Sequence, residues 1–271
     1  MSQSHTPLVP LKLGESSKAA YALSGATIAI VFLHGYSGTA VGTWKQFDSL
    51  LFDFPPAENA DLFFIGYPST TRATEASAYS FFEVLDALFT KAAAARRPSS
   101  IPGNRIEPYR KIVVVAHSMG SVVVRRALLL ADIDQRMWTQ NVAMVFFAPA
   151  HLGARFHNYV DSAVASIFKL IWEFRQYRSP AINELRIDSP YLGQLRDDVT
   201  NALQKSPTPH HLIAKRVIHG LDDIIVNQPG HNFCDDPPSI FIPGTHTSLC
   251  KPGGIDSPAV QQLRIFLERW A

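Results

Sequence analysis

Six apolar runs, rich in β-branched and aromatic residues, recur along the chain and constrain its fold more than any other feature. They cover residues 26–35, 61–67, 111–118, 141–149, 211–220 and 239–244. Most of these runs are nearly continuous in hydrophobicity, whereas a half-exposed strand would alternate between apolar and polar residues. Continuous apolar runs of this length are typical of parallel strands that helices cover on both faces.

Three stretches outside these runs have helical character. Residues 73–97 are rich in alanine with apolar residues at helical spacing, and residues 121–132 are short and largely apolar. Residues 257–271 open with Ser257 and Pro258, a suitable cap and first-turn pair for a helix. The alternation of strands and helices predicts an α/β fold with an open, mostly parallel sheet and helices on both faces.

One segment, residues 151–208, interrupts the alternation after the fourth predicted strand. It holds no strand-like run and is longer than an ordinary crossover connection. One apolar helical face runs through it, formed by Val160, Ala163, Val164, Ile167, Phe168, Ile171 and Phe174. We expect a helical insertion and a candidate lid, with a helix that simply packs on the core as the alternative. The whole chain, residues 1–271, is expected to form a single domain.

Composition excludes several classes of function and location. The formal net charge of +2 and the lack of a Lys/Arg block argue against a nucleic-acid partner. With only Cys234 and Cys250 there is no disulfide framework, and free thiols or one bridge are both open. No signal-peptide pattern or membrane-spanning run is present, so we expect a cytoplasmic protein. Peripheral contact with lipid and the oligomeric state stay open.

A lone serine stands at a sharp junction within "VVVAHSMGSVVVRRAL", residues 113–128. A serine hydroxyl is a weak nucleophile unless it is exposed, held near a base and faced by hydrogen-bond donors. A tight turn from strand to helix meets these needs, because the helix N-terminus points free N–H groups at the developing charge. Residues 116–120, "AHSMG", match G-x-S-x-G with Ala116 in place of the first glycine. The context therefore predicts Ser118 as a nucleophile.

Other interpretations of this stretch are weaker. Ser118 could be a plain helix cap, but the preceding β-branched strand and the following apolar helix favour a nucleophile. Ser121 is a weaker candidate because it lies inside the predicted helix. His117 precedes the serine in the strand, so its side chain is expected on the other face, in a structural role.

The end of the first predicted strand carries a second candidate element, "FLHGYSGTAVGTW", residues 32–44. A turn at His34 and Gly35 can place the backbone N–H of Tyr36 opposite that of Met119. Two such donors would form an oxyanion hole. The glycine spacing here does not match G-x-G-x-x-G, so the nucleotide-binding interpretation fails. We expect His34 to be a structural hydrogen-bonding residue.

A base and its orienting acid are expected later in the chain, in the order Ser, Asp, His. Asp222 and Asp223 follow the fifth predicted strand, and His246 lies on a glycine-rich loop after the last one. His219 and His231 are rivals for the base, but the chain order and the strand context favour His246. An imidazole at that loop can take the serine proton while a carboxylate holds its other nitrogen.

A zinc site is a poorer interpretation of the late cysteines and histidines. His231, Cys234 and Cys250 could be ligands, but no paired C-x-x-C or H-E-x-x-H motif occurs. The sequence therefore predicts neither a metal nor an organic cofactor.

Seven blocks in one order resemble a known family. They are "FLHGYSGTAVGTW", "FFIGYPST", "VVVAHSMGSVVVRRALL", "FFAPAHLGA", "LRIDSPYLGQL", "HGLDDIIV" and "GTHTSLCKP". Together they are similar to the lipase-like serine esterases of the α/β-hydrolase superfamily, distant relatives of GPI inositol-deacylases. The resemblance runs from about residue 27 to residue 254 and implies an α/β-hydrolase fold.

The resemblance also implies roles for single residues. The serine of its H-S-M-G block falls on Ser118, the aspartate of its G-x-x-D-x-x-V block on Asp223, and the histidine of its last block on His246. Asp222 becomes second choice, and the oxyanion donors fall on Tyr36 and Met119. Gly35 and Gly120 complete these motifs beside His34. Two departures, Ala116 and Ser121 at usual glycine positions, bear on packing more than on chemistry.

The expected function is hydrolysis of a carboxylic ester, of a small molecule or a lipid, through a Ser-Asp-His triad and an acyl-enzyme. Alternatives are an acyltransferase or amidase of the same fold, and a hydrolase-fold module that binds without catalysis.

Overall fold

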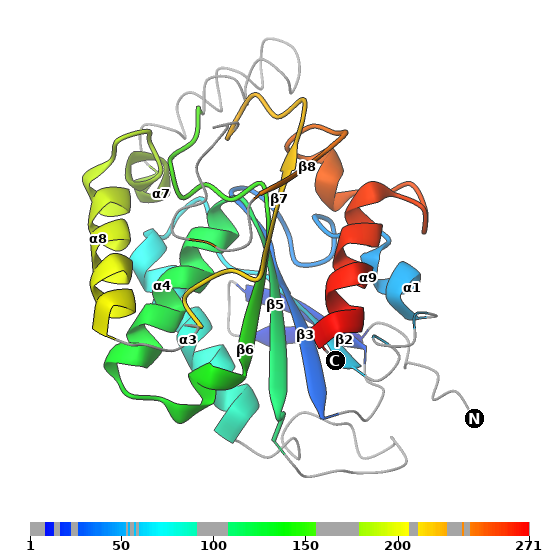
Figure 1. Ribbon diagram of the computed structural model, residues 1–271, viewed down its shortest axis with the longest axis horizontal. Coiled ribbons are helices and arrows are strands. Elements are labelled where there is room, and N and C mark those ends of the chain that lie inside the picture. The colour runs from blue at the N-terminus through cyan, green and yellow to red at the C-terminus, as the bar shows by residue number, and fades with distance from the viewer. Residues whose placement is uncertain are drawn as a thin grey trace.

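Eight strands form one open sheet in the described part of the computed structural model. They are β1 (Val9–Leu13), β2 (Ser17–Ala22), β3 (Ile28–Leu33), β4 (Ala60–Ile65), β5 (Lys111–His117), β6 (Val142–Phe147), β7 (Arg216–Gly220) and β8 (Ile240–Ile242). Their order in the sheet is β1-β2-β4-β3-β5-β6-β7-β8 (Figure 1). The structure describes residues 9–13, 17–22, 27–52, 54, 57, 60–90, 108–155, 179–205, 211–226, 235 and 239–270.

Six strands, in the sheet order β4-β3-β5-β6-β7-β8, run parallel to one another. This confirms the predicted open, mostly parallel sheet. Each falls within or beside one of the six apolar runs. The last two are shorter than predicted, because β7 begins at Arg216 and β8 covers only Ile240–Ile242.

The first two strands were not predicted. β1 and β2 form an antiparallel hairpin, and β2 continues the sheet by pairing antiparallel with β4, where Ala22 lies opposite Leu62. The sequence of β2, "SKAAYA", contains three alanines and no β-branched residue, so its strand propensity is low. Pairing with the edge of β4 supplies the hydrogen bonds that its composition does not signal.

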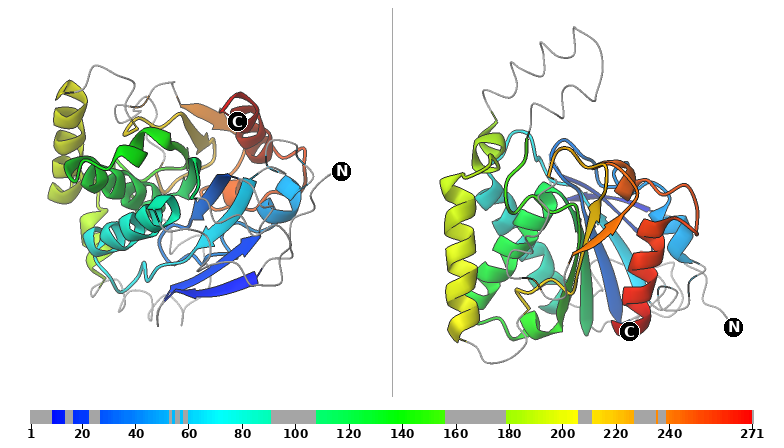
Figure 2. Two further views of the ribbon diagram at one scale, coloured as in Figure 1. Left: turned by 90° about the horizontal axis from the view of Figure 1, so that it is seen from below. Right: turned by 45° about the horizontal axis from the view of Figure 1, so that its top comes forward.

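Helices cover both faces of the sheet. The layer that lies left of the sheet in Figure 1 contains α3 (Thr74–Thr90), α4 (Met119–Ile133), α7 (Pro180–Glu184) and α8 (Pro190–Lys205). The opposite layer contains α1 (Phe47–Phe52) and α9 (Pro258–Trp270), and Figure 2 shows the same separation from below. Short 3₁₀ segments in the described ranges include Met137–Asn141 and Ser248–Cys250. No described helix combines the length and the hydropathy that crossing a membrane requires.

The three predicted helices are present. α3 ends at Thr90, beyond which the predicted residues 91–97 lie outside the described part. α9 begins at Pro258, as expected. α4 begins at Met119, two residues before its predicted start, so the helix follows Ser118 directly.

The described part of the insertion contains two helices, and a turn at residues 151–155 carries an isolated bridge from Ala154 to Arg186. α7 and α8 lie within residues 151–208, and α8 packs beside α4, with Leu192, Leu195 and Val199 of α8 buried. These two helices therefore extend the layer of α3 and α4. The apolar face predicted from Val160 to Phe174 lies outside the described residues.

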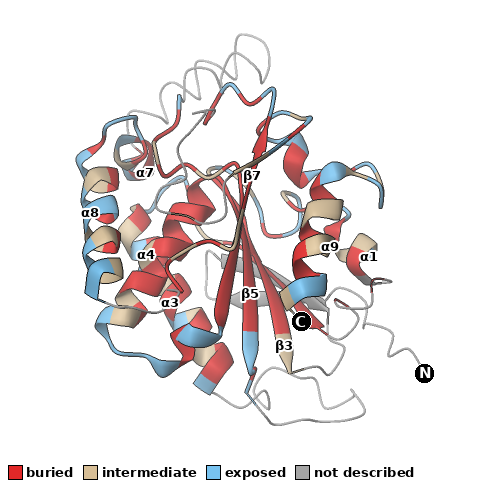
Figure 3. Ribbon diagram, in the orientation of Figure 1, coloured by how far each residue is buried: buried red, intermediate tan, exposed pale blue. Residues whose placement is uncertain are grey.

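Most residues of the central strands are buried, as Figure 3 shows along β3, β5 and β7. Val113, Val114 and Val115 in β5 have no exposed surface, because helices cover the sheet on both sides. Burying each such side chain stabilises the fold by about 1.5–3 kcal/mol before entropy is counted. β5 is therefore a rigid support for the residues that follow it.

The order of the strands places a crevice at one end of β3 and β5. The chain passes from β3 to β4 on one side and then crosses to β5 on the other. In open α/β sheets, ligands bind where this reversal occurs, outside the carboxyl ends of the strands. The segments that leave β3 and β5 at that end contain Gly35 and Ser118.

Candidate active site

Ser118 lies at the corner between β5 and α4. Its backbone has φ 51° and ψ −122°, a conformation that L-residues rarely adopt and that costs of order 1–3 kcal/mol. Ser118 occupies the N-cap position of α4, but its side chain makes no capping hydrogen bond, which argues against the interpretation as a plain helix cap. The corner places Ser118 at the start of a helix whose first N–H groups lack intrahelical partners.

Ser121 supports this corner from inside α4. It is fully buried, and both its N–H and its Oγ donate to the carbonyl oxygen of Ser118, at 3.1 and 2.5 Å. The N–H of Ala150 donates to the same oxygen at 3.3 Å. The serine that replaces a usual glycine therefore strengthens the turn. Ala116 is equally well accommodated, buried in β5 between its partners on β3 and β6.

Two glycines allow the His34–Gly35 turn to approach the serine corner closely. A Cβ built on Gly35 would lie 2.8 Å from the Cβ of Ser118. A Cβ on Gly120 would lie 2.5 Å from the carbonyl oxygen of His34. Any larger residue at either position would push the two segments apart. The contact brings the segment that carries Tyr36 beside the start of α4, where Met119 lies.

We expect Gly120→Ala to lower stability by about 1–3 kcal/mol, because its methyl group would overlap rigid backbone. Gly193→Ala in α8 is the matched control. A Cβ there has no neighbour within 4 Å, and alanine should stabilise an exposed helix by about 0.5–1 kcal/mol. Thermal unfolding of both variants measures the difference. Equal shifts of Tm in the two variants would contradict the close approach at Gly120.

The candidate base and acid are in contact. His246 Nδ1 lies 2.8 Å from Asp223 Oδ2, and both side chains are buried. The other oxygen of Asp223 accepts the backbone N–H groups of Ile225 and Val226, at 2.8 and 3.0 Å. Burial by itself raises the pKa of Asp223, but the bonds from His246 and these two N–H groups outweigh it and keep the pKa below its usual value. Asp223 is therefore an anion that holds one nitrogen of His246.

Backbone contacts connect the turn that carries Asp223 with the loop that carries His246. The N–H of Asp222 donates to Gly244 O at 3.0 Å, and a Cβ on Gly220 would meet the same oxygen at 2.3 Å. Gly244 has φ 138°, a conformation that favours glycine. Asp222 itself is exposed, so the structure brings Asp223 to His246 and leaves Asp222 at the surface.

The rival histidines do not share this arrangement. The ring of His219 stacks on Phe241 at 5.2 Å, and burial lowers its pKa. His231 lies outside the described residues.

His34 holds its own turn together. Its Nδ1 donates to Gly35 O at 2.7 Å, and its Nε2 accepts the N–H of Tyr67 at 3.1 Å. The Tyr67 hydroxyl donates to His34 O, and the two rings stack at 4.5 Å. Burial lowers the pKa of His34 to about 4, so its ring is neutral near pH 7. The turn that carries Tyr36 is thus fixed by a structural histidine.

His117 contacts the candidate base His246. Sequence reasoning missed this contact. Its Nε2 lies 2.9 Å from the carbonyl oxygen of His246, and the two rings are 4.6 Å apart between centroids. Burial, together with the nearby His246, lowers the pKa of His117 to about 3. Its place immediately before the serine was a signal, but only the fold could bring residue 246 beside it.

The buried neutral histidines predict that acid destabilises the fold. The pKa values of His34 and His117 lie at about 4 and about 3, far below the 6.5 of a histidine in an unfolded chain. As the pH falls below 6.5, the unfolded chain binds more protons than the folded chain. For each of these histidines, the free energy of unfolding therefore falls by up to ~1.4 kcal/mol per pH unit. Urea denaturation at about pH 7 and about pH 5 measures the loss, and His34→Gln should reduce it. A constant free energy of unfolding would contradict the prediction.

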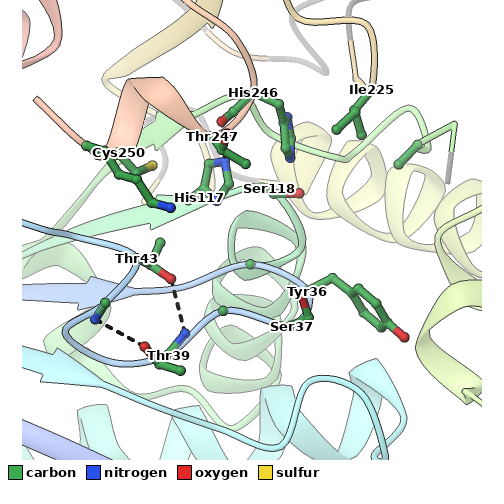
Figure 4. Close-up of a pocket in the computed structure, with 15 residues that line it drawn as sticks. Tyr36, Ser37, Thr39, Thr43, His117, Ser118, Ile225, His246, Thr247 and Cys250 are labelled. Carbon is green, nitrogen blue, oxygen red and sulfur yellow. Dashed lines mark hydrogen bonds between the residues drawn. The ribbon is translucent and has the colours of Figure 1, made fainter. Parts of the chain in front are cut away.

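Ser118 and His246 line one cavity of about 240 Å³ (Figure 4). Tyr36, Ser37, Thr39 and Thr43 come from the segment after β3, and Figure 4 shows them across the cavity from Thr247 and Cys250. His117 and Ile225 also line this cavity. The cavity therefore joins the segments after β3 and β5 to the loop after β8.

Cys250 is a buried free thiol, and burial raises its pKa well above the usual value. Of the proposed zinc ligands, His231 and Cys234 lie outside the described residues. Within the described ranges, no group of three metal-ligating side chains converges.

Residues 30–246 match the profile of the alpha/beta hydrolase family. The chain belongs to the alpha/beta hydrolase family. The match covers most of the sheet and the cavity-lining residues as far as His246, and it ends before Thr247 and Cys250. The fold expected from the resemblance is thereby confirmed.

The human Protein SERAC1 is 28% identical to this hydrolase over 186 residues, which are 62% of this chain and 27% of that protein. The chain thus spans about a quarter of the length of this curated relative. Mature Bacillus licheniformis lipase BlEst2 has a similar structure, with a TM-score of 0.53, 13% identity and coverage of 90% and 91% of the two chains. The peroxisomal alpha-beta-hydrolase Lpx1 of Saccharomyces cerevisiae has a TM-score of 0.50, 13% identity and coverage of 97% and 85%. These structures share the fold.

Proposed function

We propose that this alpha/beta hydrolase cleaves carboxylic esters, of a small molecule or a lipid, with Ser118 as nucleophile. One observation carries the proposal. An ionised, buried Asp223 holds Nδ1 of His246, and His246 lines the same cavity as Ser118 at its strained corner. Such a set of nucleophile, base and orienting acid is the arrangement that activates serine.

The chemistry follows from the placement of these groups. With Asp223 accepting the Nδ1 proton, Nε2 of His246 is free to take the proton of Ser118 as Oγ attacks the ester carbonyl. The tetrahedral oxyanion is stabilised by the N–H groups of Tyr36 and Met119. His246 then gives its proton to the departing alcohol, which leaves an acyl group on Ser118. A water molecule, deprotonated by His246, attacks this acyl-enzyme, and His246 returns the proton to Oγ of Ser118 as the acid is released.

A panel of p-nitrophenyl esters, with acyl chains of roughly two to twelve carbons, tests the proposal, and the chain-length optimum reports the size of the acyl pocket. A fluorophosphonate probe, which labels activated serines, is applied in parallel, and the labelled peptide is identified by mass spectrometry. We expect hydrolysis together with labelling at Ser118. Labelling without hydrolysis of any ester points to an amide or another acyl acceptor. Absence of both supports a binding module.

A further inference from the structure

His117 connects the nucleophile to the base through a single side chain. It is the last residue of β5, directly before Ser118, and its side chain is buried. Its Nε2 lies 2.9 Å from the backbone carbonyl oxygen of His246. A carbonyl oxygen only accepts hydrogen bonds, so Nε2 must carry the proton and donate it.

This bond complements the one made by Asp223. The carboxylate holds the imidazole ring of His246 at Nδ1, whereas His117 holds the main chain of the same residue. The ring orientation and the position of the backbone are thus set by different partners. Because His117 is adjacent to Ser118 in the chain, the backbone of the base is connected to that of the nucleophile by one residue.

The ring of His117 is suited to this place because it stays neutral. Burial lowers its pKa to about 3, and Trp44 packs edge-on against it at 6.4 Å. His246 becomes an imidazolium during catalysis, 4.6 Å away between ring centroids. A second charge at that distance would oppose the proton transfer, whereas a neutral N–H donor does not.

We propose that His117 is a positioning residue, whose Nε2–H bond to the His246 carbonyl sets the distance between the base and Ser118. The inference rests on the proposed function only in that it takes His246 as the base. A misplacement of about 1 Å in such a site can reduce the rate about 100-fold.

Two amide substitutions test the proposal, since they differ by one methylene. His117→Gln places an NH₂ group about where Nε2 lies, and His117→Asn cannot reach the carbonyl. We expect kcat on a p-nitrophenyl ester to fall about 10- to 100-fold in the Asn variant with KM nearly unchanged, and to stay within about 5-fold of wild type in the Gln variant. Equal losses in both variants, or none in the Asn variant, would overturn the proposal.

A double substitution shows whether His117 acts through the base. Once His246→Ala has removed the imidazole, adding His117→Asn should not lower the residual hydrolysis of an activated ester further. A structural role unrelated to the base would lower it as much as in the wild-type background, and this result would also overturn the proposal.

A proton NMR measurement separates this inference from the proposed function. The His246 Nδ1 proton shared with Asp223 should give a sharp low-field resonance in the wild type and in His117→Gln, and a broadened one in His117→Asn. That result supports the positioning role of His117 even in a protein that cleaves no ester. An unchanged resonance in the Asn variant counts against the positioning role of His117, whatever the ester panel shows.

Discussion

Ser118→Ala should lose ester hydrolysis by a factor on the order of a million in kcat and lose all labelling by a fluorophosphonate. The size of the effect follows because the nucleophile, base and acid act as one unit, and removal of the serine leaves only binding and the oxyanion donors. The fold should persist, because the Ser118 side chain makes no capping bond and its carbonyl, which alanine keeps, is the group that accepts the bonds of the corner. Hydrolysis of p-nitrophenyl esters and gel detection of the probe measure both results.

Ser121→Ala is the matched control for this prediction. Ser121 lies three residues further on in the same helix and is fully buried, and its Oγ donates to the carbonyl of Ser118. Its removal should weaken the corner by about 1 kcal/mol and leave labelling intact. If Ser118→Ala still reacts with the probe, the nucleophile is another serine and the proposed mechanism fails.

Asp223→Asn should reduce kcat about 10,000-fold with little change in structure. The backbone N–H groups of Ile225 and Val226 both donate to Oδ1, so the amide oxygen of asparagine will occupy that position. Its NH₂ group is then directed at Nδ1 of His246, which must become the acceptor. The imidazole proton moves to Nε2, and the base can no longer take a proton from Ser118.

Asp222→Asn is the control, since it changes the same charge one residue away. Asp222 is exposed, and the bond that connects it to the loop of the base comes from its backbone N–H. Its activity should stay within about twofold of wild type, because an exposed charge is largely screened. Comparison of kcat for the two variants decides between them. A larger loss from Asp222→Asn would show that the wrong carboxylate is assigned.

The strand pattern was predictable because parallel strands are buried on both faces. The run "KIVVVAH" is typical of a central strand, and β5 is a central strand with all but its first residue buried. The same reasoning located the serine corner, since a strand and a helix that both pack on the core need a tight junction. The hairpin β1–β2 escaped prediction because alanine-rich β2 derives its structure from an edge of the sheet, a partner that local sequence does not encode.

Chain order and the end of each strand were enough to nominate Ser118, His246 and a neighbouring aspartate from the sequence, and the family resemblance preferred Asp223 to Asp222. Only the tertiary structure decided which of Asp222 and Asp223 turns inward, because neighbouring residues in a turn differ in direction and not in chemistry. The contact between His117 and His246 joins residues 129 positions apart, and no periodicity reports such a pair. Local sequence determines which elements form and where they end, whereas the distances between catalytic groups arise from the packing of those elements against one another.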